Sequence, residues 1–178
     1  MQLHSRTRKL ASIALWVAAA SVLYFVENRF FPTGLPWRIG IANIVTLITL
    51  SLFGFRISLG ITIARCILGS MLGGQFLSAS FFMGLSGGIV STIVMAVLLG
   101  RFNQLGPVGV SIIGALAHNL TQVALVYLVF ARTGGIVYYL PWLWILSLSG
   151  GLICGILYMM LIRNINYINR RFEIYGTG

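Results

Sequence analysis

The sequence predicts an all-α membrane protein, and three observations predict it. Of the 178 residues, 58% are hydrophobic and only 8% are charged, whereas a water-soluble domain carries roughly a quarter charged residues. The chain has only two acids, Glu27 and Glu173, so it cannot build an ordinary charged surface. Six apolar runs follow one another, each close to the ~20 residues that a helix needs to cross a bilayer.

The six runs form one transmembrane domain over residues 1–178. The first run follows basic residues, as a signal peptide does, but it has no clear cleavage site and further apolar runs follow it. We therefore expect a retained first span. Glycine, proline and arginine separate the runs, in the segments 32–36, 54–56, 73–75, 101–107 and 132–135. The spans are predicted near 10–27, 38–54, 56–73, 76–99, 107–130 and 139–162.

The basic residues predict the orientation of the bundle. All except Arg65 flank the apolar runs, as topology signals do, and they form no stripe that could follow a nucleic-acid backbone. An N-in, C-in arrangement fits an even number of spans and places most of these residues in the cytoplasm. The cytoplasmic set is then Arg6, Arg8, Lys9, Arg56, Arg101, Arg163, Arg170 and Arg171, and the outer set is Arg29, Arg38 and Arg132.

Several catalytic patterns are missing from the sequence. It contains no GxxxxGK[ST] loop for binding ATP phosphates. It has no Asp, so the carboxylate clusters that hold Mg²⁺ on diphosphates cannot form. Cys66 and Cys154 lie inside apolar runs without metal-ligand spacing, which favours small core residues over a disulfide or a metal site. We expect neither independent catalysis, nor an intrinsic cofactor, nor a metal.

Arg65 is a charged residue in the middle of the third span. Charge in hydrocarbon costs several kcal/mol on common scales, so a buried arginine needs a partner or a role. A guanidinium suits a phosphate or carboxylate, which predicts an anionic substrate. The alternative is a structural clamp onto backbone carbonyls or Glu27. Glu27 itself either forms an interfacial ion pair with Arg38 or Arg29, or receives the polar end of a ligand.

The fifth span carries three strongly hydrogen-bonding side chains. His118 and Gln122 are four residues apart and share a helix face, with Asn119 next to it. Each can donate and accept hydrogen bonds, as a heterocyclic ligand requires. The alternative is hydrogen bonding between helices, which is common in membranes. Asn43 and Thr46, one turn apart on the second span, are predicted to face the same cavity.

Small residues predict how the helices pack. Gly60, Ala64 and Gly69 on the third span, and Gly84, Gly87, Gly88 and Ser91 on the fourth, allow close approach. On the first span, Ala14, Ala18 and Ser21 share one side. The sequence leaves two readings open for Ala14 and Ala18, namely packing within the bundle and docking of another membrane subunit.

Three of these segments resemble a known family. They are residues 35–47 (LPWRIGIANIVTL), 64–69 (ARCILG) and the stretch 109–120 (GVSIIGALAHNL). They resemble signatures of the Gx transporter family, whose members are often labelled heptaprenyl diphosphate synthase component I. That family is similar to the substrate-binding S-components of energy-coupling-factor vitamin transporters.

The resemblance implies a six-helix bundle with an outward-facing site under the loop between the first two spans. It also implies a transmembrane coupling subunit and cytoplasmic ATPases as partners, with Ala14 and Ala18 as the docking face, in the plasma membrane of a prokaryote. The implied role is binding of a small anionic, aromatic cofactor or vitamin, with flavin favoured. The site then consists of Arg65, Asn43, Thr46, His118, Asn119 and Gln122, with Glu27 and Arg38 near the mouth.

The synthase label implies a different role. Prenyl diphosphate synthases rely on Asp-rich motifs, and this chain has no Asp. The label therefore leaves a noncatalytic membrane component of isoprenoid and quinone-chain metabolism, which would bind a prenyl diphosphate. A third hypothesis is a structural anchor of a membrane redox complex.

Overall fold

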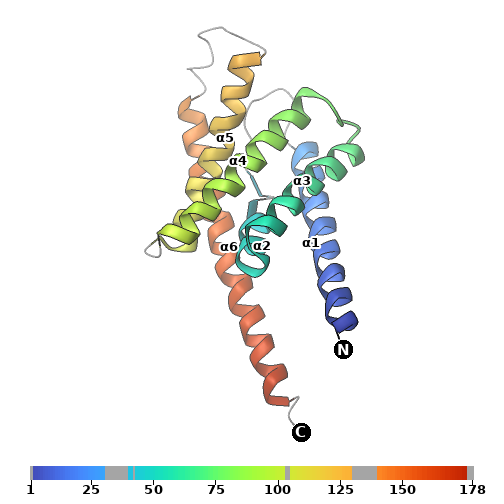
Figure 1. Ribbon diagram of the computed structural model, residues 1–178. Coiled ribbons are helices and arrows are strands. Elements are labelled where there is room, and N and C mark those ends of the chain that lie inside the picture. The colour runs from blue at the N-terminus through green and yellow to red at the C-terminus, as the bar shows by residue number, and fades with distance from the viewer. Residues whose placement is uncertain (1, 31–39, 42, 103–104, 130–139, 176–178) are drawn as a thin grey trace.

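A computed structural model of the chain describes residues 2–30, 40–41, 43–102, 105–129 and 140–175. Six helices make up this part of the chain, and no β-strand occurs in it, which confirms the all-α prediction. The helices are α1 (Gln2–Phe30), α2 (Asn43–Phe53), α3 (Phe55–Leu72), α4 (Ala79–Arg101), α5 (Pro107–Val129) and α6 (Leu140–Tyr175) (Figure 1).

Helix α2 is shorter than the sequence predicted. A full span was expected near 38–54, but α2 has 11 residues, and only the other five helices are long and apolar enough to cross a membrane. The reason lies at Gly40, whose φ of +77° departs from helical geometry. The backbone N–H of Asn43 donates to the Gly40 carbonyl (2.8 Å), and the helix begins there. At 1.5 Å per residue, α2 covers roughly half of a ~30 Å hydrocarbon core.

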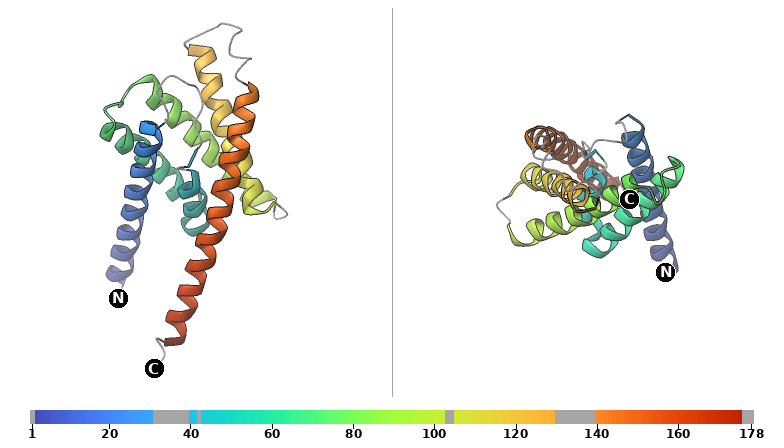
Figure 2. Two further views of the ribbon diagram at one scale, coloured as in Figure 1. Left: turned by 180° about the vertical axis from the view of Figure 1, so that it is seen from behind. Right: turned by 90° about the horizontal axis from the view of Figure 1, so that it is seen from above.

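The first turns of α1 and the last turns of α6 lie at the same end of the molecule (Figures 1 and 2). This agrees with both termini on one side of a membrane. The assignment of that side to the cytoplasm stays a prediction. Helix α6 continues to Tyr175, well past the predicted end of the sixth span at residue 162.

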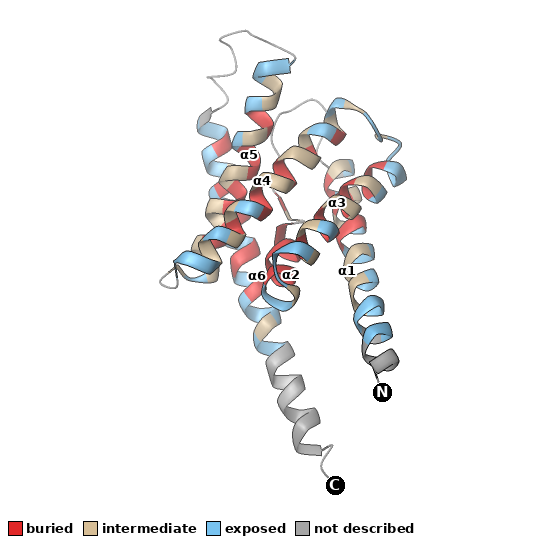
Figure 3. Ribbon diagram, in the orientation of Figure 1, coloured by how far each residue is buried: buried red, intermediate tan, exposed pale blue. Residues whose placement is uncertain are grey.

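Burial in the bundle is the reverse of that in a water-soluble protein. Large apolar side chains such as Leu15 and Leu128 point outward, whereas Arg65, Gln122 and Asn119 are among the largest side chains that are fully buried. Figure 3 shows the buried positions gathered along the inner faces of the helices, with exposed positions outside. An apolar exterior, with polar side chains confined to the interior, is the arrangement expected for a bundle in lipid.

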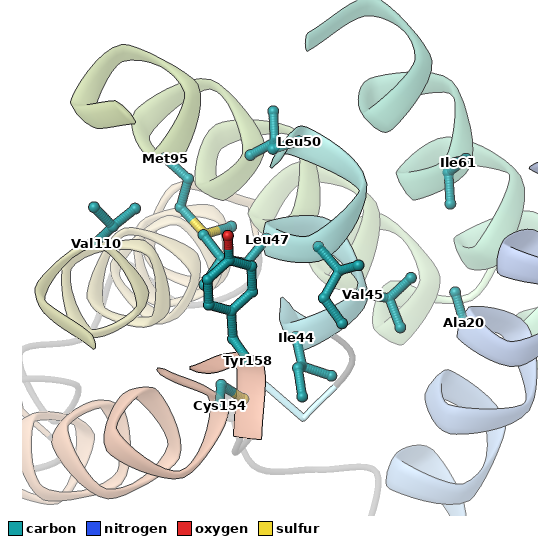
Figure 4. Close-up of a cluster of buried hydrophobic side chains, with 11 residues drawn as sticks. Ala20, Ile44, Val45, Leu47, Leu50, Ile61, Met95, Val110, Cys154 and Tyr158 are labelled. Atoms are coloured by element: carbon teal, nitrogen blue, oxygen red, sulfur yellow. The ribbon is translucent and has the colours of Figure 1, made fainter. Parts of the chain in front are cut away.

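Helix α2 lies at the centre of the bundle. All residues from Asn43 to Leu50 are buried, and every other helix contributes a side chain to the apolar cluster around it (Figure 4). The cluster combines Ile44, Val45, Leu47, Ile48 and Leu50 of α2 with Ala20, Ile61, Met95, Val110, Cys154 and Tyr158. At the far end of α2, the Tyr158 and Ser51 hydroxyls are hydrogen-bonded at 2.7 Å. The half-length helix is therefore enclosed by the five long ones.

Glycines set the closest helix contacts. A Cβ at Gly69 would lie 2.9 Å from the Ser21 carbonyl oxygen of α1, so Gly69 packs as predicted. Gly60 does not, because a Cβ there would meet nothing within 4 Å. The sequence reading missed Gly151 and Gly155, which form a G-x-x-x-G pair on α6. Their Cβ atoms would lie 2.5 and 2.6 Å from the Cα atoms of Ile112 and Val108 on α5.

Candidate binding site

The turn before α2 is held from two sides. Its Gly40 N–H donates a hydrogen bond of 2.5 Å to Oε1 of Glu27 on α1. Its carbonyl oxygen accepts from Sγ of Cys154 on α6, at 3.5 Å. A side chain at Gly40 would be strained by its positive φ and would also press on Asn43, whose Nδ2 lies 3.1 Å from the Cβ position. Glycine is therefore required where the chain enters α2.

Asn43 connects this turn to Arg65. Nη2 of Arg65 donates to Oδ1 of Asn43 at 3.2 Å, and both residues are buried, at 2% and 3% exposed. Nδ2 of Asn43 has no hydrogen-bond partner among the described residues. We call Glu27, Gly40, Asn43 and Arg65 the charged centre. It joins α1, the start of α2 and α3.

Gly88 of α4 provides space beside the guanidinium. A Cβ at this position would lie 3.7 Å from Nη2 of Arg65 and 3.0 Å from Cγ2 of Thr62. Gly88 is one of the small residues of the fourth span, and its missing side chain lets α4 approach the charged centre. Sequence reasoning named Gly88 as a packing residue only.

Hydroxyl groups fill the space between α2, α3 and α4 next to the charged centre. Oγ1 of Thr62 lies 3.4 Å from that of Thr46 and 3.2 Å from that of Thr92. Thr49 and Ser58 are hydrogen-bonded at 2.8 Å. We call these five residues the hydroxyl cluster. Thr46 was expected to line the site, and the structure places it here, one turn from Asn43 and bonded to α3.

The predicted residues of α5 also lie in the interior. Nε2 of Gln122 and Nε2 of His118 are hydrogen-bonded at 2.8 Å, so these two side chains share a face as expected. Asn119 instead donates to the Ser147 hydroxyl of α6, at 2.9 Å. All four residues are buried, and Oε1 of Gln122 has no partner among the described residues. We call His118, Asn119, Gln122 and Ser147 the amide cluster.

Two consecutive glycines separate the charged centre from the amide cluster. Gly88 faces Arg65, whereas a Cβ at Gly87 would lie 2.9 Å from the carbonyl oxygen of His118 and 3.0 Å from its Nδ1. Because both glycines belong to one turn of α4, the two polar groups contact α4 at the same turn. The candidate residues therefore lie as neighbouring groups on either side of α4.

The surroundings of Glu27 differ from those of the arginines near it. Glu27 is buried (5% exposed) and turns toward Gly40, whereas Arg29 is exposed. The predicted partner Arg38 lies outside the described residues. Glu27 therefore belongs to the charged centre.

The two alanines of the predicted docking face are both exposed. Ala14 and Ala18 lie on the outer side of α1, while Ser21 is buried against Gly69 of α3. Sequence reasoning missed the roles of Gly40, Cys154 and Ser147. Glycine commonly marks a turn, but no sequence signal indicates the positive φ of Gly40 or its contact with Cys154.

Comparison with known proteins gives one match. No curated protein and no solved structure matches the chain. The model of one family, described as heptaprenyl diphosphate synthase component I, matches residues 16–161. That range includes the charged centre, the hydroxyl cluster and the amide cluster. The resemblance read from the sequence is confirmed, and the chain belongs to this family.

Proposed function

We propose that the chain is the solute-binding membrane subunit of an importer for a small anionic solute. The observation that carries the proposal is the buried Arg65 guanidinium, hydrogen-bonded to Asn43 at the first turn of a half-length helix. Transporters commonly bind anionic groups at the N-terminal ends of such interrupted helices.

The charges favour an anion at this point. A helix N-terminus carries a partial positive charge, and the guanidinium adds a full one that is matched in shape to a carboxylate or phosphate. Nδ2 of Asn43 supplies a further donor that has no partner among the described residues. In the low dielectric of a membrane interior, these donors attract an anion much more strongly than they would in water.

The amide cluster would bind the uncharged part of the solute. His118 and Gln122 offer both donor and acceptor groups, and Oε1 of Gln122 is available as an acceptor. Such groups match the edge of a heterocycle. A solute with an anionic end and a heterocyclic ring fits this pair of groups, and a flavin is the cofactor we favour.

Energy for uptake would come from other chains. The sequence has no ATP-binding loop, so we propose a transmembrane coupling subunit and cytoplasmic ATPases as partners. The exposed Ala14 and Ala18 would let a partner helix approach α1 closely. Copurification of ATPase subunits with the chain tests this part of the proposal.

The family description favours one rival. A noncatalytic component of prenyl diphosphate metabolism would use the same guanidinium to hold a diphosphate. The apolar tail of such a ligand would need a path to the lipid-facing surface of the bundle.

Identification of the bound ligand separates the two functions. The chain would be purified gently, denatured, and its extract analysed by absorbance and mass spectrometry. A flavin or vitamin supports the importer, and a polyprenyl diphosphate supports the rival. We expect Arg65→Gln to lose the ligand, while Arg56→Gln, at an exposed position of the same helix, keeps it. If the Arg65→Gln protein carries the same amount of ligand as the wild type, the charged centre is not the site.

A further inference from the structure

Glu27 brings a negative charge into the site proposed for an anion. Its carboxylate accepts the Gly40 N–H at the turn that leads into α2. The only other acid in the sequence is Glu173, close to the C-terminus. The sequence therefore provides one acid in the spanning part of the chain, and the structure places it against the backbone of the charged centre.

The side-chain amide of Asn43 lies between Arg65 and the turn at Gly40, with its oxygen toward Arg65 and its nitrogen toward Gly40. Its Oδ1 accepts from the cation, Arg65. Its Nδ2 lies beside Gly40, the residue that Glu27 binds, and has no partner among the described residues. An acceptor atom bound to this Nδ2 therefore lies close to Gly40, whose N–H donates to Glu27.

A solute anion at this position conflicts with Glu27. Two like charges a few ångströms apart in a medium of low dielectric repel each other by several-fold more than in water. A single backbone N–H also serves one strong acceptor at a time. The solute and Glu27 therefore compete for the same donors.

We propose that Glu27 is an internal competitor that regulates affinity at the charged centre. When solute binds, its anionic group takes the Gly40 N–H together with the donors of Asn43 and Arg65, and the Glu27 carboxylate moves aside. When solute leaves, the tethered carboxylate returns. This inference rests on the proposed anion site, and it adds that Glu27 lowers affinity so that release is possible.

The competition also sets the class of solute. An uncharged molecule gains little from Arg65 and cannot compensate for the hydrogen bond lost by Glu27. A phosphate or diphosphate group, with several acceptor oxygens, replaces the carboxylate at the N–H and still reaches the guanidinium. The site therefore selects a phosphate-bearing solute over its neutral analogue.

The test measures anion binding by the purified, full-length chain in detergent. Its thermal unfolding would be followed while sodium phosphate or sodium diphosphate is added, with sodium chloride of equal ionic strength as the reference. The variants are Glu27→Gln, which keeps an acceptor for the Gly40 N–H, and Arg65→Gln. Arg29→Gln, at an exposed position two residues from Glu27, is the matched control.

We expect Glu27→Gln to bind the anion about tenfold more tightly than the wild type, with Arg29→Gln unchanged. Equal affinity in wild type and Glu27→Gln, lost in Arg65→Gln, keeps the anion site but overturns the competitor. Weaker binding by Glu27→Gln also overturns it, because Glu27 would then help to hold the solute. Binding by Arg65→Gln equal to wild type, or no binding by any form, defeats the proposed site itself.

A second measurement does not depend on the folding of a Glu27 variant. In Glu173→Gln, Glu27 is the only remaining side-chain carboxylate. Its infrared stretching band would be recorded with and without diphosphate. We expect the band to shift as the Gly40 N–H is released. Diphosphate binding with no change in this band would contradict the proposal.

Discussion

The contact between α5 and α6 and the contact between α2 and α3 are built in opposite ways. Helices α5 and α6 make the most extensive contact of the described bundle, with Gly151 and Gly155 set directly against the backbone of α5. Helices α2 and α3 are joined by side-chain hydrogen bonds through Asn43, Thr46 and Thr49. Shape complementarity therefore fixes the first pair, and hydrogen bonding fixes the second.

The difference separates the glycine-packed part of the α5–α6 contact, which serves as a scaffold, from the charged centre. Two helices that meet backbone to backbone at a glycine can shift very little relative to each other, because protein interiors are close-packed. Hydrogen bonds between side chains can be exchanged for bonds to a ligand at little net cost. The charged centre lies at the start of α2. The hydrogen bonds that could be exchanged for bonds to a ligand therefore lie where we propose that the solute binds.

The largest effect is expected from Gly151→Ala. The new Cβ would lie 2.5 Å from the Cα of Ile112, which cannot rotate away as a side chain can. We expect a loss of up to about 3 kcal/mol in the free energy of unfolding, typical of overpacking. Thermal unfolding in detergent measures it, with Gly60→Ala as control because a Cβ there meets nothing within 4 Å. Equal stability of the two variants would show that α5 and α6 are not rigidly packed.

Asn43→Leu should cost less, about 1–2 kcal/mol in the free energy of unfolding. It removes one acceptor of the buried Arg65 guanidinium and replaces the Asn43 amide with an apolar side chain. Solute binding should be lost as well, which a packing variant such as Gly151→Ala would not cause without unfolding. The same unfolding measurement, followed by ligand extraction, checks both effects. A stable Asn43→Leu protein that still carries ligand would remove Asn43 from the site.

The smallest effect is expected from Thr62→Val, about 1 kcal/mol in the free energy of unfolding, because two hydrogen bonds between membrane helices are lost at about 0.6 kcal/mol each. Thr62 is bonded to both Thr46 and Thr92, so the variant tests the middle of the hydroxyl cluster. Thr121→Val is the matched control, because Thr121 bonds only to a carbonyl oxygen of its own helix among the described contacts. A loss above 2 kcal/mol would mean that α2 and α3 are as rigidly joined as α5 and α6.

The sequence predicted the long helices well because their ends carry strong local signals. The third and fifth spans, expected at 56–73 and 107–130, are Phe55–Leu72 and Pro107–Val129. Gly54 and Pro107 mark where these helices start. The start of the second helix was predicted too early, because the apolar run continues through Gly40. Composition does not reveal the positive φ of this glycine. The sixth span, expected near 139–162, agrees with the apolar part of α6 at Pro141–Asn164, and the helix continues beyond it to Tyr175.

The sequence identified candidate residues for the site, but it did not predict how these residues are arranged in space. A buried charge is costly, so Arg65 stood out, and Asn43 proved to be its hydrogen-bonding partner. Contacts between distant segments could not be read from the chain. The approach of Cys154 to Gly40 joins residues 114 positions apart, and the space at Gly88 depends on how α4 crosses α3.

The enclosure of α2 has a consequence for the synthesis of the protein. A helix of 11 residues with Asn43, Thr46 and Thr49 on it is too short and too polar to be stable alone in lipid. Its last partners, Cys154 and Tyr158, leave the ribosome only when most of the chain has been made. The enclosure of α2 therefore cannot be completed before α6 has been made, whereas all four residues of the charged centre belong to the first 65 residues of the chain.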